Sequence, residues 1–316
     1  MNSLMAREHP KHNVGAARTR WLNGACAAIC VTFDNMGEAA DLNRKLRPES
    51  APIGSHYSVT RVAPKMLALA ANYDIAITYF IECWNIHIYG QFILDNIVGA
   101  GHEVGWHAWQ HEPWAKFKSV DEERANFERS FGPQGIGQWV EEGLTAPYSG
   151  FRPPGGIVNG DDTLRLCRQY GLCYLSPAGE QAATVAVGSA EDRLVILPFK
   201  WAAVDAYFYM ETFAGLRKIK KEYPEAPQTP EVLVQRYIAE IDQTIAAGGF
   251  LAPLFHPFLT DQPDRLEALE TVLAYLAQKR ANGEVWLAQC RDVAEFIREH
   301  PDCVGTDPHW DFSSWR

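Results

Sequence analysis

The sequence predicts an α/β fold in which a parallel sheet closes into a barrel. Short apolar runs alternate with longer segments of helical periodicity along most of the chain. Such alternation is typical of parallel strands that are joined by helices. The chain has 316 residues, which is an ordinary length for a single α/β barrel. The number of strand–helix repeats, roughly seven, is also one that suits closure into a barrel.

The expected strands are short apolar runs that end in polar or turn-forming residues. The first of them, "ACAAICVTF" at 25–33, is apolar throughout and therefore predicts a strand buried on both faces. The run at 149–155, "SGFRPPG", predicts a short strand that leads into a Pro/Gly turn. The complete set of expected strands is 25–33, 75–82, 102–108, 149–155, 172–177, 193–201, 250–259 and 284–290.

The expected helices lie between these runs and have apolar residues at helical spacing. Ser119 precedes Glu122 by three residues, which predicts a capped helix start for 119–131. The segment 229–249 predicts a long amphipathic helix that ends in two glycines. The complete set of expected helices is 62–73, 92–101, 119–131, 161–171, 229–249, 263–283 and a last helix after residue 290.

The two ends of the chain lie outside this pattern. We therefore divide the chain into an N-terminal extension (1–23), a barrel (24–299) and a C-terminal tail (300–316). The tail contains Trp310 and Trp315, which are expected to pack against other protein surface. A neighbouring subunit is one candidate for that surface, and it would make the protein a homodimer.

Composition excludes several functional classes. The net charge is -10 and no block of Lys and Arg is present, which disfavours nucleic acid or an anionic membrane as the main partner. No apolar run approaches eighteen residues, so no transmembrane helix is expected. The first residues lack the apolar core of a signal peptide. We therefore expect a cytoplasmic protein that acts on a small molecule, with its 7 cysteines reduced.

Polar residues gather where the predicted strands end. In parallel α/β folds the carboxyl ends of the strands share one edge, and chemistry collects there. Each of these residues alone has an ordinary structural explanation, such as a helix cap, a surface ion pair or a core histidine. Their common position at one edge favours a functional site. The residues are Asp34, Asn35, Glu82, His107, His111, Arg152, Asp205 and His256.

Five segments resemble the motifs of the polysaccharide deacetylases, the NodB-homology family of carbohydrate esterase family four. They follow the family's order over roughly residues 24 to 299. The family's Thr-Phe-Asp-Asp motif is similar to "TFDN" (32–35), and its His-Ser/Thr-x-x-His motif to "HAWQH" (107–111). Its Arg-x-Pro-x-Gly motif resembles "RPPGG" (152–156). A late Asp-containing segment resembles "AVDAYF" (203–208), and the Leu-x-His motif resembles "LFH" (254–256).

The resemblance implies a distorted (β/α)7 barrel that performs metal-assisted hydrolysis of an N-acyl amide. His107 and His111 would bind Zn²⁺ or another divalent metal, with Asn35 at the position of the family's metal-binding Asp. Asp34 would act as general base and His256 as the acid that protonates the departing amine. Arg152 would hold Asp34 ionised and oriented, and Asp205 would orient His256 or Arg152.

Asn35 departs from the family pattern and leaves alternatives open. A neutral amide oxygen is a weaker metal ligand than a carboxylate. Either Asn35 is still a ligand, or Asp34 takes the ligand role and another group such as Glu82 or Glu38 becomes the base. In a third alternative no metal binds and Asn35 hydrogen-bonds the substrate.

The segments around the motifs suggest how a substrate is held. They are rich in aromatic residues, which suits a small, partly apolar substrate. We expect Glu82, Trp109, Pro153 and Tyr207 to contact it. The long irregular connection at 36–60 is placed to fold over the site as a lid, with His56 and Tyr57 as contacts.

Three functions are consistent with these residues. The leading one is metal-dependent removal of an acetyl or formyl group from a small amine, amino sugar or natural-product intermediate. The second is ring-opening hydrolysis of a cyclic imide or ureide, with or without a metal. The third is an inactive barrel that binds an acylated ligand.

Overall fold

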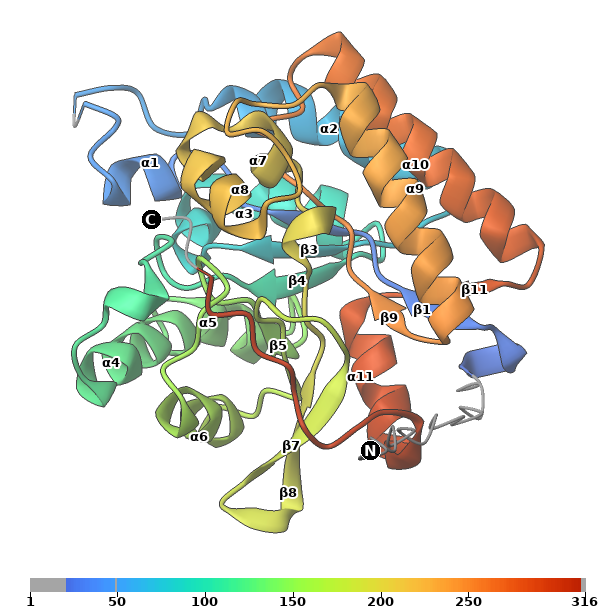
Figure 1. Ribbon diagram of the computed structural model, residues 1–316. Coiled ribbons are helices and arrows are strands. Elements are labelled where there is room, and N and C mark those ends of the chain that lie inside the picture. Colours follow the sequence, from blue (N-terminus) through green and yellow to red (C-terminus); the bar gives the residue numbers. More distant parts are fainter. Residues whose placement is uncertain (1–20, 49, 314–316) are drawn as a thin grey trace, which may run out of the picture.

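The computed structural model describes residues 21–48 and 50–313. Most of the predicted N-terminal extension, and Trp315 of the predicted tail, therefore lie outside the described residues. Figure 1 shows helices packed around a strongly curled sheet. The described elements run from a 3-10 turn at Leu22–Gly24 to another at Pro301–Cys303.

The main sheet has eight strands in the order β10-β2-β3-β4-β5-β6-β8-β7. All of its pairs are parallel except β7 with β8. A parallel bridge from Val204 to Leu254 connects the segment after β8 back to β10, which brings the two sides of the curled sheet together. The expected α/β fold of the distorted-barrel type is therefore confirmed. The strands are β2 (Thr32–Asp34), β3 (Thr78–Ile81), β4 (Glu103–Trp106), β5 (Gly150–Phe151), β6 (Tyr174–Leu175), β7 (Ala183–Val187), β8 (Ser189–Ile196) and β10 (Leu254–Phe255).

Two predicted strands are each divided into two. The run 25–33 forms β1 (Ala27–Ile29) and β2, and the run 250–259 forms β9 (Phe250–Leu251) and β10. β1 pairs with β9 and with β11 (Val285–Leu287) in a separate three-stranded sheet. The strands change partners at Cys30 and Val31, which an uninterrupted apolar run does not reveal.

The helices follow the predicted order with shifted ends. Ser119 caps α4, since its side chain accepts a hydrogen bond from the Glu122 backbone N–H at 3.4 Å. The predicted helix 92–101 begins earlier, at Ile86, and continues as a π-helical turn over Leu94–Val98. The main helices are α2 (Ala63–Asn72), α3 (Ile86–Ile93), α4 (Val120–Phe131), α5 (Ile136–Glu141), α6 (Asp161–Gln169), α8 (Ala214–Lys220), α9 (Pro230–Ala247), α10 (Pro263–Ala281) and α11 (Cys290–Glu299).

Close packing inside the sheet fixes where the strands end. Gly150 of β5 lies so close to Tyr174 of β6 that an added Cβ would stand 2.0 Å from the Tyr174 ring. The Tyr174 hydroxyl donates to the buried Glu103 carboxylate at 2.9 Å. These contacts hold β5 against β6, and Arg152 directly follows the end of β5.

The described part of the tail packs on its own chain. Trp310 forms a bridge to Gly179, and Asp311 pairs with Lys220 at 2.5 Å. Within residues 21–48 and 50–313, none of the helices combines the length and the apolar character that a membrane crossing requires.

Candidate active site

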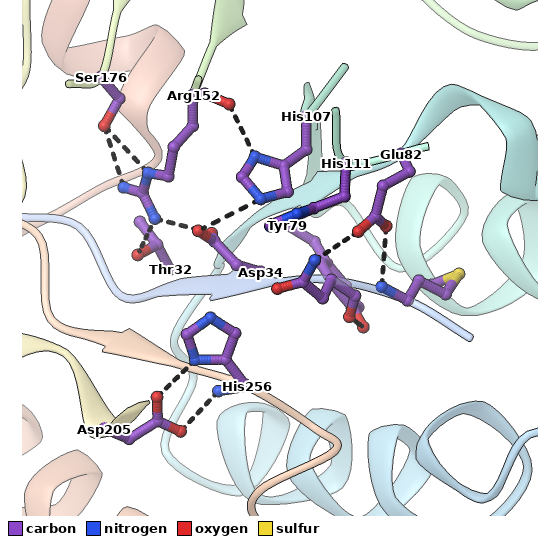
Figure 2. Close-up of polar contacts among 12 residues, drawn as sticks. Thr32, Asp34, Tyr79, Glu82, His107, His111, Arg152, Ser176, Asp205 and His256 are labelled. Carbon is purple, nitrogen blue, oxygen red and sulfur yellow. Dashed lines mark hydrogen bonds and ion pairs between the residues drawn. The ribbon is translucent and has the colours of Figure 1, made fainter. Parts of the chain in front are cut away.

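The predicted polar residues lie at the carboxyl edge of the parallel strands. Asp34 is the last residue of β2, and Glu82, His107 and Arg152 directly follow β3, β4 and β5. His256 directly follows β10. Asp205 begins α7 (Asp205–Tyr209), next to the bridge that joins Val204 to Leu254. Figure 2 shows these side chains turned toward one region.

Glu82, His107 and His111 form a buried group that could hold a divalent metal ion. One ligand atom from each lies within 4.8 Å of the others. The backbone takes a left-handed conformation at Ala108 (φ 66°) and at His111 (φ 64°). This tight turn, rather than a helix, is what brings the two imidazoles together, with ring centroids 4.8 Å apart.

The chemistry of these side chains fits a metal ion. Burial lowers the pKa of His107 to about 4, although the Asp34 charge opposes this. Burial and the nearby charge of His107 hold the pKa of His111 well below its usual value. Both imidazoles are therefore neutral at pH 7, the form that binds metals. His107 Nδ1 donates to the Arg152 carbonyl at 2.7 Å, which leaves the lone pair of Nε2 available.

Glu82 supplies the carboxylate of the group. Its Oε2 accepts from the Met36 N–H at 3.0 Å and from Asn85 Nδ2 at 3.1 Å, and Asn35 Nδ2 donates to Oε1. Burial raises the pKa of Glu82 to about 7, although these hydrogen bonds oppose the increase. Asn35 has a positive φ of 63° and lines the cavity beside the group. Asn35 has no carboxylate of its own, but its side-chain amide helps to hold the Glu82 carboxylate in place.

Asp34 forms a buried ion pair with Arg152. Arg152 Nη1 donates to Asp34 Oδ1 at 2.8 Å and to Thr32 Oγ1 at 2.9 Å. Its Nε and Nη2 both donate to Ser176 Oγ, and the guanidinium lies 4.1 Å from the centroid of the Phe80 ring. Asp34 Oδ2 lies 4.0 Å from His107 Nε2. The ion pair therefore fixes one oxygen of Asp34 and leaves the other on the side of the metal-ligand group.

Asp205 holds His256 on the opposite side. The Asp205 Oδ1–His256 Nδ1 distance is 2.5 Å, and the His256 backbone N–H donates to Asp205 Oδ2 at 2.7 Å. Burial alone would lower the pKa of His256, but the charge and hydrogen bond of Asp205 raise it above the usual value. Because Nδ1 is taken, only Nε2 can act on a ligand. Figure 2 shows this second nitrogen turned toward the Asp34 side.

A small cavity joins these groups. Its volume is about 50 Å³, and Asp34, His107, His111 and His256 all line it. The facing wall is apolar and comes from the segment after β8 and from the loop after β10. This wall comprises Phe199, Trp201, Met210, Phe213 and Phe258. A polar centre against an apolar wall is the usual composition of a small-molecule site.

The predicted substrate contacts have different locations. Pro153 lines the cavity, and Glu82 belongs to the metal-ligand group. Trp109 and Tyr207 instead pack in the interior, outside the cavity lining. The Trp109 ring lies 4.0 Å from the Arg129 guanidinium, and the fully buried Tyr207 packs edge-on against Phe208.

The predicted lid, residues 36–60, does reach the site, but through a different residue. It contains α1 (Ala39–Asn43), and the following residue, Arg44, lines the cavity. Arg44 Nη2 lies 3.0 Å from His111 Nδ1. His56 and Tyr57 are not among the residues that line the cavity. The His56 Nδ1 instead contacts Ser58 Oγ at 2.7 Å, and the Tyr57 hydroxyl donates to the Phe258 carbonyl at 2.8 Å.

Sequence reasoning missed Arg44 and the place of Glu82 in the ligand group. Glu82 directly follows β3, which lies between β2 and β4 in the sheet. A carboxylate at the end of the strand between those of Asp34 and His107 was a usable signal. Arg44 had none, because its position depends on the course of an irregular loop.

Comparisons with known proteins agree with this architecture. Residues 23–175 match the family described as "Polysaccharide deacetylase". A structure from Mycobacterium smegmatis that bears the name of that family is 24% identical, with a TM-score of 0.73 over 94% of this chain and 98% of that one. A Pseudomonas aeruginosa PAO1 structure of the same name is 18% identical, with a TM-score of 0.69 over 94% and 99%.

A structure named Puue allantoinase shares the fold equally well, with 16% identity and a TM-score of 0.70 over 94% of this chain and 98% of that one. A search of curated proteins finds no match to the sequence. Residues 23–175 therefore belong to the polysaccharide deacetylase family by their match to its family model, and the fold is shared with the Mycobacterium smegmatis structure over 94% of this chain.

Proposed function

We propose that this protein is a metal-dependent hydrolase that cleaves a C–N amide bond of a small substrate and removes an acetyl or formyl group. The product that keeps the nitrogen would be a small amine, an amino sugar or a natural-product intermediate. The observation that carries this proposal is the convergence of three groups on one region: the Glu82–His107–His111 group, the Asp34–Arg152 pair and the Asp205–His256 pair.

Zn²⁺ is the metal that we propose for the site. Two imidazoles and one carboxylate form a ligand set that occurs in catalytic zinc sites. Glu82, His107 and His111 would hold the ion, which would polarise the amide carbonyl and make a water molecule more acidic.

Asp34 is proposed as the general base. Arg152 fixes its Oδ1, so Oδ2 on the His107 side is the oxygen that can accept a proton from the attacking water. The bonds of Arg152 to Thr32 and Ser176 keep the guanidinium, and with it the carboxylate, in one orientation.

His256 is proposed as the general acid. An amine is a poor leaving group unless it is protonated as the C–N bond breaks. Asp205 stabilises the protonated imidazole, and the raised pKa of His256 favours that form near neutral pH. The proton on Nε2 then passes to the departing nitrogen, while Asp205 holds the ring through Nδ1.

The cavity supports a small substrate. Sites for drug-sized ligands typically enclose about 300 to 1,000 Å³, whereas this cavity measures about 50 Å³ beneath the lid. We expect a substrate to displace part of the lid, residues 36–60, when it enters. The apolar wall, which includes Phe199 and Phe213, is expected to bind an apolar part of the substrate.

Ring-opening of a cyclic imide or ureide is the second candidate. It is supported by the likeness to the Puue allantoinase over nearly the whole of both chains. Hydrolysis of a cyclic amide needs the same two functions, activation of water and protonation of the departing nitrogen. Asp34 and His256 would serve it in the same positions.

Metal analysis combined with a substrate panel tests the proposal. The protein is purified without added metal, then assayed with zinc on N-acetyl and N-formyl amines and on cyclic imides and ureides. We expect one zinc per chain and turnover of the linear amides, both lost in His107→Ala. His309→Ala, a change of an exposed histidine in the tail, should retain both.

The outcomes separate the candidates. Turnover of cyclic amides alone would favour the second function. Tight binding of an acylated ligand without turnover of any amide would instead indicate an inactive barrel.

A further inference from the structure

Arg44 is the lid residue that reaches the metal-ligand group. It follows α1, is half-buried and lines the cavity. Its Nη2 lies 3.0 Å from Nδ1 of His111. His107, the other imidazole of the group, makes a different kind of contact, because its Nδ1 faces a carbonyl oxygen.

Counting donors and acceptors shows what the Arg44 contact requires. A guanidinium has only N–H donors, so Nδ1 of His111 must accept the hydrogen bond. A neutral imidazole has one lone pair for this purpose, and its other nitrogen, Nε2, then carries the proton. In this arrangement neither nitrogen of His111 has a free lone pair.

A metal ion and Arg44 therefore exclude one another at His111. Coordination through Nδ1 takes the same lone pair that Arg44 uses. Coordination through Nε2 moves the ring proton to Nδ1, where it would face the N–H groups of Arg44. His107 does not meet this conflict, since its Nδ1–H points at the Arg152 carbonyl oxygen.

A displaced Arg44 side chain would remain at the cavity, which it lines. Arg152, the second arginine among the described cavity-lining residues, is already bonded to Asp34. The facing wall is apolar, with Phe199 and Phe258 among its members. A guanidinium at such a site binds an anionic oxygen group of a ligand, and a carboxylate matches its geometry best.

We propose that Arg44 competes with the metal ion for His111 and, once displaced by the metal, binds a carboxylate of the substrate. The second half of this proposal rests on the proposed function. It narrows the substrate class to small amides that carry both a carboxylate and an apolar group, such as N-acylated apolar amino acids.

The first experiment measures zinc binding and does not require activity. Zinc affinity is determined by chelator competition for the wild type, Arg44→Met and Arg61→Met. Arg61 is an exposed cation that follows the lid and pairs with Asp261, and its removal provides a charge-matched control. We expect Arg44→Met to bind zinc about tenfold more tightly, a gain of about 1.4 kcal/mol, and Arg61→Met to resemble the wild type.

The nitrogen NMR signals of His111 give a second readout. In the metal-free protein the proton should be on Nε2, and it should leave that position when zinc is added. A proton on Nδ1 before zinc is added would overturn the proposal, as would equal zinc affinity in all three proteins. Zinc binding to none of them would contradict the proposed function as well.

The second experiment compares an N-acetyl apolar amino acid with its neutral C-terminal amide in the zinc-loaded enzyme. We expect the wild type to prefer the acid, and Arg44→Met to lose about tenfold of that preference through KM rather than kcat. Arg61→Met should keep the preference. An unchanged preference in Arg44→Met would contradict the substrate-binding half, whereas failure to cleave either compound would contradict both this half and the proposed function.

Discussion

Replacement of Glu82 by Gln should stabilise the metal-free protein while it weakens the metal site. The Glu82 side chain is fully buried and accepts hydrogen bonds from Asn35, Met36 and Asn85. A glutamine oxygen can keep the bonds from Met36 and Asn85. Its NH₂ group can donate to Asn35 if the Asn35 amide turns over. The substitution therefore removes a buried charge at little cost in hydrogen bonds.

The pKa of Glu82 sets the size of the effect. Folding raises that pKa from 4.5 to about 7, a difference of about 2.5, and each pKa unit corresponds to about 1.4 kcal/mol. The product is about 3 to 4 kcal/mol. Since the folded state binds the proton more tightly, the wild type loses this stability as the pH rises from 4.5 through 7. The glutamine of the variant has no titrating group, so the variant keeps its stability over the same range.

Denaturant unfolding of the metal-free proteins at several pH values measures this difference. We expect Glu82→Gln and the wild type to have nearly equal free energies of unfolding at about pH 4.5. At about pH 8 the variant should be more stable by about 3 to 4 kcal/mol, while its zinc affinity falls. A difference in stability that does not change with pH would refute the reasoning, and so would undiminished zinc binding.

Three further predictions follow from the same geometry. Arg152→Met should lower the free energy of unfolding by about 3 to 5 kcal/mol, because it leaves Asp34 buried and unpaired. A free energy of unfolding within about 1 kcal/mol of the wild-type value would argue against the ion pair. Asp205→Asn should move the alkaline limb of the kcat profile to lower pH, because activity is lost as His256 deprotonates and Asp205 raises its pKa; an unmoved limb would exclude His256 as the acid. Zinc affinity should fall about tenfold for each pH unit below the Glu82 pKa of about 7, because zinc must then displace a proton; an affinity that is constant between about pH 5 and 8 would exclude Glu82 as a ligand.

The sequence predicts the location of the site because strand ends can be recognised in it. Asp34, His107 and His256 each follow an apolar run, and parallel strands place such positions at one edge. The structure brings these residues to one cavity. That part of the prediction depends only on the order of strands and helices, which the apolar pattern records.

The direction of individual aromatic side chains is not predictable in the same way. Trp109 lies between two residues with positive φ, Ala108 and His111, and its ring packs against Arg129 and is not part of the cavity lining. Tyr207 lies in the short helix α7, and every residue of that helix is buried, so periodicity does not distinguish its faces. Whether Trp109 and Tyr207 can contact a substrate depends on this local geometry, which the sequence pattern does not record.

Loop residues and sheet breaks are also beyond the sequence pattern. The antiparallel hairpin of β7 and β8 turns at Gly188 (φ 79°), and β7 was not among the predicted strands. Arg44 contacts His111 from a loop that Glu38 also helps to hold, since Glu38 accepts from Gly54 N at 3.1 Å and from the Tyr89 hydroxyl at 2.6 Å. These contacts join residues that are far apart in the sequence, so local sequence patterns cannot predict them.

A crystal structure of the zinc-loaded protein, with the ion located by its anomalous scattering, tests the central claim most directly. We predict one ion bound by Glu82, His107 and His111, with the Asn35 amide still donating a hydrogen bond to the Glu82 carboxylate. An ion coordinated by Asn35 in place of Glu82, or located away from both histidines, would contradict the account.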